Sequence, residues 1–478
     1  SPAVPATLAS YSNIYSIGLE WNITGDTNHN AAVAVQYRVQ GAGTWRQAMA
    51  LLRVDSLGRN MLAGSILFLS PNTNYEVKLD LSDIDGGTAS QTVIIKTRPL
   101  PTMPAGGRTL HVTTGSGSGD GSSGNPYKGI AAAQAAAQPG DILLLHAGSY
   151  GSARAVFNKS GLAGGSYIVW KGAGDGEVLF PGGISIEANS VWFDAITIRN
   201  QPYATLSAIL ANNLGPTDVV ITKSNFINNH YNIYFQRGGS YWYIADNTVV
   251  GDTAQATESL EGEGIEMANY AATSFGHTVA HNSITNVADG ISSPGVNTDI
   301  FGNDIFDTSD DGIEPDPGGV NVRIWGNRIH NTAHNGISFQ PQSGAPYYIL
   351  YNQIVNFKEA IFKFRQTDRS IIAHNTFVMP NDMICCNPAH LMHSYLRNNL
   401  WVSVAGGQIW NFGGSVKSWE TDFDYDGFDW GTSQNPIIYG NQTHKALSTF
   451  AGASGLESHG KMITKSCFDS FNVPAQAM

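Results

Sequence analysis

Ser309-Asp310-Asp311-Gly312-Ile313-Glu314 is the middle member of a repeated pattern that also includes Ala288-Asp289-Gly290-Ile291 and His334-Asn335-Gly336-Ile337. The glycines of the three segments lie 22 and 24 residues apart. A repeat of this length is typical of one turn of a parallel β-solenoid, in which residues far apart in sequence stack in one column. The repeat therefore predicts a solenoid that carries a column of acidic side chains on its surface.

Asparagine recurs through the same part of the chain, mostly at intervals of 21–25 residues. The members of this repeat are Asn225, Asn247, Asn282, Asn303, Asn327, Asn352, Asn375 and Asn398. An asparagine at a fixed corner of each coil can hydrogen-bond to its neighbours above and below, so we expect a structural ladder. The interval from Asn247 to Asn282 is longer by about a dozen residues, and we expect the extra residues around 252–261 to form a wall of a binding groove.

The composition favours an extracellular all-β protein. Of 478 residues, 53 are glycine and only 13% are charged. The net charge of −12 excludes binding of nucleic acid or anionic membranes through the whole surface. The sequence contains no run of about 18 apolar residues, the length that a transmembrane helix requires. Three cysteines cannot form a disulfide framework. We therefore expect a secreted protein held together by its core, with Cys385 and Cys386 as buried apolar residues.

Residues 1–98 alternate apolar and polar residues over short stretches, as in Ile17-Gly18-Leu19-Glu20-Trp21, with glycine-rich turns between the stretches. That pattern is typical of a small β-sandwich. The segment Leu69-Ser70-Pro71-Asn72-Thr73-Asn74-Tyr75 resembles the loop that precedes a tyrosine-bearing strand in fibronectin type III domains. Residues 99–107 are rich in proline and glycine and predict a short, stiff linker.

The second predicted domain, residues 108–478, opens with a glycine-rich loop at 115–121, an alanine-rich helix at 130–137 and an apolar strand at 142–145. Pro139-Gly140-Asp141 should end the helix before the strand. This order resembles the N-terminal cap of secreted right-handed β-helix proteins, in which a helix covers the open end of the solenoid. The predicted fold is therefore all-β, a right-handed parallel β-helix preceded by a small, fibronectin type III-like β-sandwich.

Aromatic residues crowd the segment after residue 400, where the repeat loosens. They are Trp401, Trp410, Trp419, Phe423, Tyr425, Phe428 and Trp430. Their rings could stack on sugar rings or close the C-terminal end of the solenoid, and the sequence supports both interpretations equally.

Alignment of the coils on their Gly-Ile pairs brings one residue before each pair into register: Glu263, Asp289, Asp311, Asn335 and, before Ala360-Ile361, Glu359. Strands of adjacent coils lie about 4.8 Å apart, so Asp289 and Asp311 should be side by side. Like charges that close cannot all ionise freely, and we expect at least one carboxyl to keep its proton near neutral pH. A protonated carboxyl beside an ionised one is the pair that glycoside hydrolysis requires.

The same coils resemble the polygalacturonase-like and dextranase-like β-helix glycosidases. Asp289-Gly290, Asp310-Asp311 and His334-Asn335-Gly336 match the acidic and histidine-bearing coils of that family, and Lys363 and Arg365 loosely match its basic coil. Lys363 and Arg365 fall one residue away from the family's strand positions. The resemblance implies an inverting hydrolase without a cofactor, in which Asp311 donates a proton and Asp289 and Asp310 activate water. The implied catalytic residues are Asp289, Asp310, Asp311 and His334.

A second family fits the same acids. Ala288-Asp289-Gly290 and Asp310-Asp311-Gly312-Ile313-Glu314 resemble two coils of the calcium-dependent β-helix pectate lyases. That resemblance implies β-elimination on a uronate polymer, with Ca²⁺ held by Asp289, Asp310, Asp311 and Glu314. The base lysine of that family lies on the following coil, where this chain has Ser338-Phe339-Gln340, whereas Lys363 lies two coils away.

The other charged residues near the column are expected to bind substrate. They are Glu263, Glu266, Glu314, Asp316, Lys363 and Arg365. The sequence thus predicts a monomeric, secreted enzyme that cleaves a polysaccharide, with no nucleic-acid or membrane partner. Hydrolysis is the leading mechanism and calcium-assisted elimination the alternative. A non-catalytic glycan-binding solenoid is the third possibility, because one fold can serve all three functions.

Overall fold

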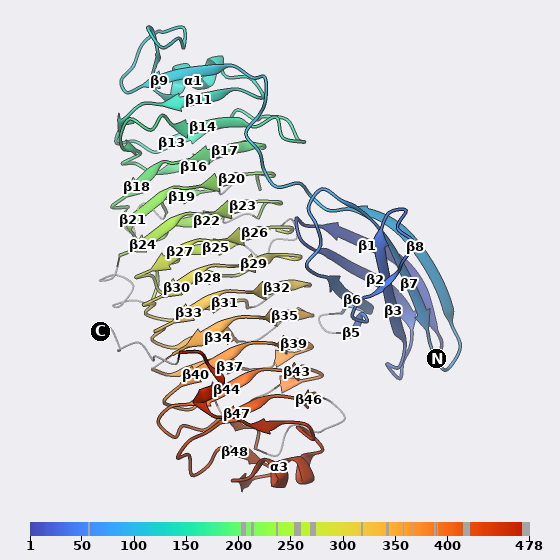
Figure 1. Ribbon diagram of the computed structural model, residues 1–478. Helices are drawn as coiled ribbons and strands as arrows, with labels where there is room; N and C mark the ends of the chain where they lie inside the picture. The colour runs from blue at the N-terminus through green and yellow to red at the C-terminus, as the bar shows by residue number, and fades with distance from the viewer. Residues whose placement is uncertain are drawn as a thin grey trace.

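The computed structural model is almost entirely β-structure, and its main body is a right-handed parallel β-helix (Figure 1). The structure describes residues 1–55, 58–201, 207–211, 215–235, 238–252, 260–267, 274–316, 319–340, 344–356, 358–365, 367–386, 389, 391–413 and 421–470. Within these ranges no helix is long and apolar enough to cross a membrane. The predicted groove wall lies largely at residues 253–259, outside the described ranges, as does Trp419.

Three long parallel sheets form the solenoid within the described ranges, with 14, 13 and 10 strands. The 14-stranded sheet contains, in order, β10 (Tyr127–Lys128), β9 (Thr109–Thr113), β11 (Ile142–Leu145), β14 (Ile168–Gly172), β17 (Val191–Asp194), β20 (Val220–Thr222), β23 (Tyr243–Ala245), β26 (Thr278–Ala280), β29 (Asp299–Phe301), β32 (Val322–Trp325), β35 (Tyr347–Leu350), β39 (Ser370–Ala373), β43 (Tyr395–Arg397) and β46 (Asp422–Asp424). The 13-stranded sheet contains β12 (Gly148–Ser149), β15 (Val178–Leu179), β18 (Thr197–Arg199), β21 (Asn225–Asn229), β24 (Thr248–Gly251), β27 (Ser283–Thr285), β30 (Asp304–Phe306), β33 (Arg328–His330), β36 (Gln353–Val355), β40 (Thr376–Met379), β44 (Leu400–Ser403), β47 (Gly427–Asp429) and β50 (Lys461–Met462).

The ten-stranded sheet carries the repeated Gly-Ile segments. Its strands are β13 (Ala155–Phe157), β16 (Ile184–Ile186), β19 (Ile209–Leu210), β22 (Ile233–Phe235), β25 (Ile265–Met267), β28 (Ile291–Ser292), β31 (Ile313–Glu314), β34 (Asn335–Phe339), β37 (Ala360–Phe364) and β41 (Ile384–Cys385). Smaller sheets pair β38 (Thr367–Asp368) with β42 (Leu391–Met392), and β45 (Trp410–Asn411) with β48 (Ile437–Tyr439) and β49 (Gln442–His444).

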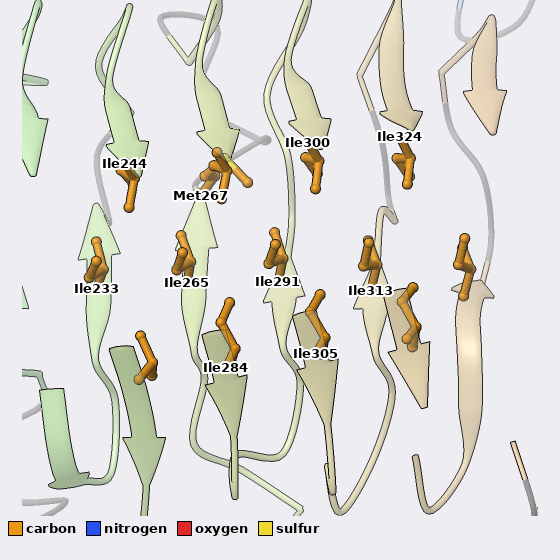
Figure 2. Close-up of a cluster of buried hydrophobic side chains, with 14 of the residues drawn as sticks. Ile233, Ile244, Ile265, Met267, Ile284, Ile291, Ile300, Ile305, Ile313 and Ile324 are labelled. Atoms are coloured by element: carbon orange, nitrogen blue, oxygen red, sulfur yellow. The ribbon is translucent and has the colours of Figure 1, made fainter. Parts of the chain in front are cut away.

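The core of the solenoid consists of columns of stacked isoleucines, one column for each sheet (Figure 2). Ile265, Ile291 and Ile313 come from adjacent strands of the ten-stranded sheet and are fully buried. Ile284 of the 13-stranded sheet and Ile300 of the 14-stranded sheet face them across the interior. Because side chains alternate along a strand, burial of each isoleucine directs the next residue to the outer face of the sheet.

Glycine precedes these isoleucines because the chain leaves no room for a Cβ atom. A Cβ on Gly290 would lie 2.5 Å from both the Gly312 carbonyl oxygen and Ile305 Cγ2. A Cβ on Gly312 would lie 2.5 Å from Ile329 Cγ2 and 2.7 Å from the Gly336 carbonyl oxygen. The glycine thus lets adjacent coils approach closely at the corner where the acidic residues lie.

Replacing Gly312 with alanine is expected to lower the free energy of unfolding by about 1–3 kcal/mol, because the added methyl group overpacks a rigid corner. Urea denaturation would measure the loss. Gly43→Ala is the matched control, because a Cβ at Gly43 would meet no heavy atom within 4 Å. Equal stability of the two variants would contradict this account of the Gly-Ile pair.

The structure confirms an asparagine ladder, in which each side-chain amide donates to the Oδ1 atom of the next asparagine. Its members are Asn247, Asn282, Asn303, Asn327, Asn352, Asn375 and Asn399, and it ends on Asp426. The prediction is wrong for two of the expected members of the ladder. Ser224, not Asn225, precedes Asn247 at this corner, and Asn398 adopts a left-handed φ of 57° beside the ladder.

Helices cover both ends of the solenoid (Figure 1). The helix α1 (Ile130–Ala136) ends within one residue of its predicted boundary, and β11 occupies the predicted strand. At the other end lie α3 (Leu447–Ser454) and the short 3-10 helix η2 (Lys465–Cys467). Of the aromatic residues after 400, Trp401, Trp410, Phe423, Phe428 and Trp430 are buried. These five rings close the end of the core, and of the predicted aromatic residues that the structure describes only Tyr425 is largely exposed.

The pair Cys385 and Cys386 departs from the sequence-based expectation of buried apolar residues. The two sulfur atoms are bonded to each other, and both residues are half-buried. The core still consists of apolar side chains without a disulfide framework in the described part of the chain.

The N-terminal residues form a small β-sandwich of two antiparallel sheets, each with four strands in the described ranges. One sheet contains β1 (Ala3–Ser12), β2 (Ile17–Gly25), β6 (Met61–Ile66) and β5 (Leu52–Val54). The other contains β4 (Arg46–Gln47), β3 (Ala32–Val39), β7 (Asn74–Ser82) and β8 (Thr88–Lys96). The sandwich packs beside the middle coils of the 14-stranded sheet (Figure 1). Val54 and Met61 form one buried cluster with Val320 and Ala345 of the solenoid.

A buried polar network joins the two parts of the chain. Arg323 Nε lies 2.6 Å from Asp299 Oδ1, and their side chains are 0% and 1% exposed. Asn13 Nδ2 and Ser16 Oγ of the sandwich each donate to Asp299 Oδ2 at 2.8 Å, and Arg323 Nη1 donates to Ser65 Oγ at 2.9 Å. Because these groups are buried and mutually bonded, the sandwich is a fixed part of the fold.

Candidate active site

The residues before the Gly-Ile pairs lie in register on successive coils of the ten-stranded sheet. Gly264 N–H donates to the Asp289 carbonyl oxygen at 2.9 Å, and Gly290 N–H donates to the Asp311 carbonyl oxygen at 3.1 Å. Asn232 N–H bonds the Glu263 carbonyl oxygen in the same way at 3.0 Å. The predicted column of Glu263, Asp289 and Asp311 is therefore confirmed as a structural feature.

Hydrogen bonds run along this column and engage one oxygen of each aspartate. The Asp311 backbone N–H donates to Asp289 Oδ1 at 2.8 Å. The backbone N–H and the Nδ2 group of Asn335 donate to Asp311 Oδ1 at 2.7 and 2.8 Å. Asp289 and Asp311 are 6% and 2% exposed. Part of the role of each aspartate is thus to hold the next coil, as a capping residue would.

Asp310 and His334 form the more accessible pair of the site. His334 Nδ1 lies 2.6 Å from Asp310 Oδ1, and the two side chains are 38% and 24% exposed, respectively. His334 Nε2 lies 3.9 Å from Glu359 Oε2. A carboxylate bonded to Nδ1 fixes the orientation of the imidazole, so Asp310 and His334 act as one positioned unit.

A second column points outward from the sheet, one residue after the buried isoleucines. Strand pairing brings Glu266 beside Ser292 and Ser292 beside Glu314. Ser292 Oγ donates to Glu263 Oε2 at 3.0 Å and so links the two columns. We define the acid cluster as Glu263, Glu266, Asp289, Asp310, Asp311, Glu314 and Asp316.

Lys363 lies in the outward column, which corrects the alignment made from sequence. That alignment set Ala360-Ile361 against Gly336-Ile337. The structure instead pairs Ala360 with Asn335 and Lys363 with Ser338. Ser338 lies one coil beyond Glu314 and Lys363 two coils beyond it. Burial raises the pKa values of Asp310, Glu314 and Asp316, and the positive charge of Lys363 opposes the rise in each, so Lys363 lies near the acid cluster.

Arg365 lies apart from the acid cluster. It is exposed, and its Nη2 atom lies 3.5 Å from Cys386 Sγ. Within the described ranges it forms no ion pair with an acid of the cluster, so the structure brings together every predicted site residue except this one.

Burial and mutual repulsion raise the pKa values of the cluster. Burial raises the pKa of Asp289 well above its usual range, and the charges of Glu263 and Glu314 raise it further. Burial, with the charges of Asp316, Asp311 and Asp310, raises the pKa of Glu314 to about 8. Glu314 therefore holds its proton at neutral pH, as the close spacing of carboxyls predicts.

The other acids of the cluster shift in the same direction. Burial raises the pKa of Glu266 to about 7, with a contribution from Glu261, and that of Asp316 to about 7. Burial and then Asp311 raise the pKa of Asp310, while the hydrogen bond from His334 opposes the rise. Burial, followed by the charge of Glu266, raises the pKa of Glu263 well above its usual range. The cluster therefore holds both protonated and ionised carboxyls near neutral pH.

Among the residues that the structure describes, one group of three could contribute ligands to a metal ion. Ligand atoms of Asp310, Asp311 and His334 all lie within 4.8 Å of one another. Ca²⁺ prefers six to eight oxygen ligands, whereas one of these three donors is an imidazole that is already bonded to Asp310. The donor set fits Ca²⁺ poorly.

The sequence analysis missed Tyr234 and Tyr231, whose rings stack on each other at this face. Tyr234 follows Ile233 as Glu266 follows Ile265, and strand pairing brings Tyr234 beside Glu266. Extension of the alignment by one coil toward the N-terminus would have found Tyr234, although Asn232 replaces glycine there.

Comparison with a protein-family model agrees with the fold. A family model described as "Right handed beta helix region" matches residues 182–377. The chain is similar to the catalytic domain of a GH87 alpha-1,3-glucanase variant in complex with nigerose, at 11% identity over 96% of this chain and 92% of that chain, with a TM-score of 0.41. It is also similar to a mutant of the periplasmic alginate epimerase AlgG, at 12% identity over 68% of this chain and 77% of that chain, with a TM-score of 0.26. No curated protein sequence gives a significant match. At these similarities the two structures assign no activity to this chain.

Proposed function

We propose that this protein hydrolyses a polysaccharide that lies across the outer face of the ten-stranded sheet. One observation carries the proposal: the acid cluster combines Glu314, whose pKa is raised to about 8, with Asp310, which is held by His334 at 2.6 Å. A proton-holding carboxyl beside a positioned carboxylate is the arrangement that supports glycoside hydrolysis.

In this proposal the two carboxyls have different roles. Glu314 points outward from its strand and donates its proton to the glycosidic oxygen as the bond to the anomeric carbon breaks. Asp310 takes a proton from water, whose oxygen forms the new bond to that carbon. This assignment replaces Asp311 as donor, because Asp311 is 2% exposed and its Oδ1 atom is engaged by Asn335. Attack from the face opposite the leaving group would invert the anomeric configuration.

The charge of the cluster favours a neutral substrate. Seven acids gather at this face, and within the described ranges Lys363 is the cation whose charge acts on three of them. A uronate polymer would bring further carboxylates beside ionised ones, whereas the hydroxyl groups of a neutral glycan can donate hydrogen bonds to them. The low content of charged residues supports a place outside the cell for this activity.

Calcium-dependent elimination on a uronate polymer is the second candidate. The position of Lys363 favours it, because the lysine shares the outward column with Glu314 and could serve as base. The imidazole in the potential ligand set and the raised pKa values of the acids weigh against it, because Ca²⁺ binds ionised carboxylates.

Cleavage of a panel of polysaccharides tests the proposal. The panel contains dextran, laminarin, pullulan, polygalacturonate and alginate, and new reducing ends are measured for the wild type and for Asp310→Asn. We expect cleavage of a neutral polymer by the wild type and its loss in the variant. Equal cleavage by both proteins would contradict the role of Asp310, and binding without cleavage would make the protein a glycan-binding solenoid.

Lys363→Met is expected to move the whole pH profile of cleavage upward by about one pH unit. The lysine lowers the pKa values of Glu314 and Asp310, so its removal raises both. Glu314 must be protonated and Asp310 ionised, and therefore the alkaline and the acidic limbs should both shift to higher pH. Lys358→Met, at an exposed lysine on the same coil, should leave the profile unchanged. An unchanged profile in Lys363→Met would contradict the proposed protonation states.

A further inference from the structure

Tyr234 continues the outward column of the acid cluster toward the N-terminus. In β22 it pairs with Leu210 on one side and with Glu266 on the other. Glu314 lies three strands beyond Tyr234, which corresponds to about 14 Å along the solenoid. The side chain of Tyr234 is half-buried, so this aromatic ring lies on the same outer face as the acids.

Tyr231 makes this position a two-ring surface. The rings of Tyr231 and Tyr234 stack with centroids 5.7 Å apart and planes inclined by 25°. The hydroxyl of Tyr231 donates to Glu261 Oε2 at 2.6 Å, and His230 packs edge-on against the Tyr231 ring at 4.7 Å. Contacts on two sides hold the Tyr231 ring in place, which lowers the entropic cost of binding a ligand against it.

Carboxyl groups surround the two rings. Burial raises the pKa of the Tyr231 hydroxyl, and the hydrogen bond to Glu261 and the charges of Glu261, Glu263 and Glu266 raise it further, so these carboxyl groups lie near the hydroxyl. Aromatic faces bind the apolar C–H face of a sugar ring, and carboxylates accept hydrogen bonds from its hydroxyl groups. A carboxylated sugar would meet repulsion here.

We propose that Tyr231 and Tyr234, with Glu261 and Glu266, form a binding subsite for a neutral pyranose unit of the polysaccharide. The inference rests on the proposed function, since it places the same chain across the same sheet. It adds that affinity depends on a unit bound about 14 Å N-terminal to Glu314 along the solenoid. It also predicts that the sugar unit bound there carries no charge.

Affinity electrophoresis in gels that contain dextran, laminarin, pullulan or polygalacturonate tests the subsite. All proteins carry Asp310→Asn, so that the polymer stays intact during the run. We expect retardation by at least one neutral polymer and none by polygalacturonate. The double variant Tyr231→Ala, Tyr234→Ala should bind that polymer about tenfold more weakly, and Tyr231→Phe, Tyr234→Phe should retain most of the affinity. Tyr351→Ala is the matched control, because Tyr351 is 52% exposed beside the 14-stranded sheet.

The outcomes separate the subsite from the proposed function. Retardation only by polygalacturonate, no retardation by any neutral polymer, or equal affinity in the alanine double variant would overturn the subsite. Thermal unfolding of each variant shows whether a loss of affinity reflects misfolding, and the folded phenylalanine variant must then bind for the subsite to stand. Cleavage of a neutral polymer with unchanged affinity in the alanine variant would keep the function and discard the subsite. Binding that depends on both tyrosines, without cleavage by the wild type, would keep the subsite and discard the proposed hydrolysis.

Discussion

Glu314→Gln is expected to lower kcat for polysaccharide cleavage by about 10²- to 10⁴-fold, the range that a general acid contributes. Glutamine keeps the size and hydrogen-bonding capacity of the side chain but has no proton to give to the leaving oxygen. Because the change removes no apolar surface and no described capping bond, the variant should fold and bind polymer normally. The measurement is kcat and KM on the polymer that the wild type cleaves.

Glu187→Gln is the matched control. Glu187 is half-buried and follows β16 of the same sheet, remote from the acid cluster. It should keep wild-type kcat. A Glu314→Gln variant that retains more than about a tenth of the wild-type kcat would show that another group supplies the proton.

Arg323→Ala is expected to give the largest loss of stability, about 3 kcal/mol or more, because it leaves the buried Asp299 carboxylate without its cation. The Arg323 side chain is 0% exposed and bonds both Asp299 and Ser65. Its loss therefore weakens the solenoid and the attachment of the sandwich together. Denaturant unfolding, followed by tryptophan fluorescence, measures the change.

Arg328→Ala provides the comparison for Arg323→Ala. Arg328 begins β33 on the same coil, but it is exposed, and its removal should change stability by less than about 0.5 kcal/mol. Similar stability of both variants would contradict the view that a buried ion pair fixes the sandwich to the solenoid.

The acid column was predictable because the packing of each coil leaves a mark in the sequence. Gly290 and Gly312 have no room for a Cβ atom, and the isoleucine that follows each glycine fills the core. The Gly-Ile pair therefore fixes the register, and the residues before and after it can be assigned to the corner and to the outer face.

The prediction failed where two residues competed for one position. Ala360-Ile361 resembles a Gly-Ile pair in sequence. In the structure, however, Phe362 pairs with Ile337 and occupies the core position that corresponds to the isoleucine of the pair. Asn398-Asn399 offers two asparagines to one ladder, and only Asn399 bonds to Asn375. A shift of one residue reverses which side chains face outward, so the sequence misplaced Lys363.

The contact between the sandwich and the solenoid has no sequence pattern comparable to the Gly-Ile pair. It depends on Asn13, Ser16 and Ser65 meeting Asp299 and Arg323 across more than 250 residues of sequence. Polar residues of these types are ordinary on a protein surface. Only the three-dimensional structure shows that these are buried.

Simultaneous measurement of reducing ends and of ultraviolet absorbance during digestion of the polysaccharide panel, with and without a calcium chelator, tests the central claim most directly. Hydrolysis produces new reducing ends without unsaturated sugars, and the account predicts this result on a neutral polymer, with no effect of the chelator. Ultraviolet-absorbing products from a uronate polymer, abolished by the chelator, would contradict it and assign the acid cluster to calcium-dependent elimination.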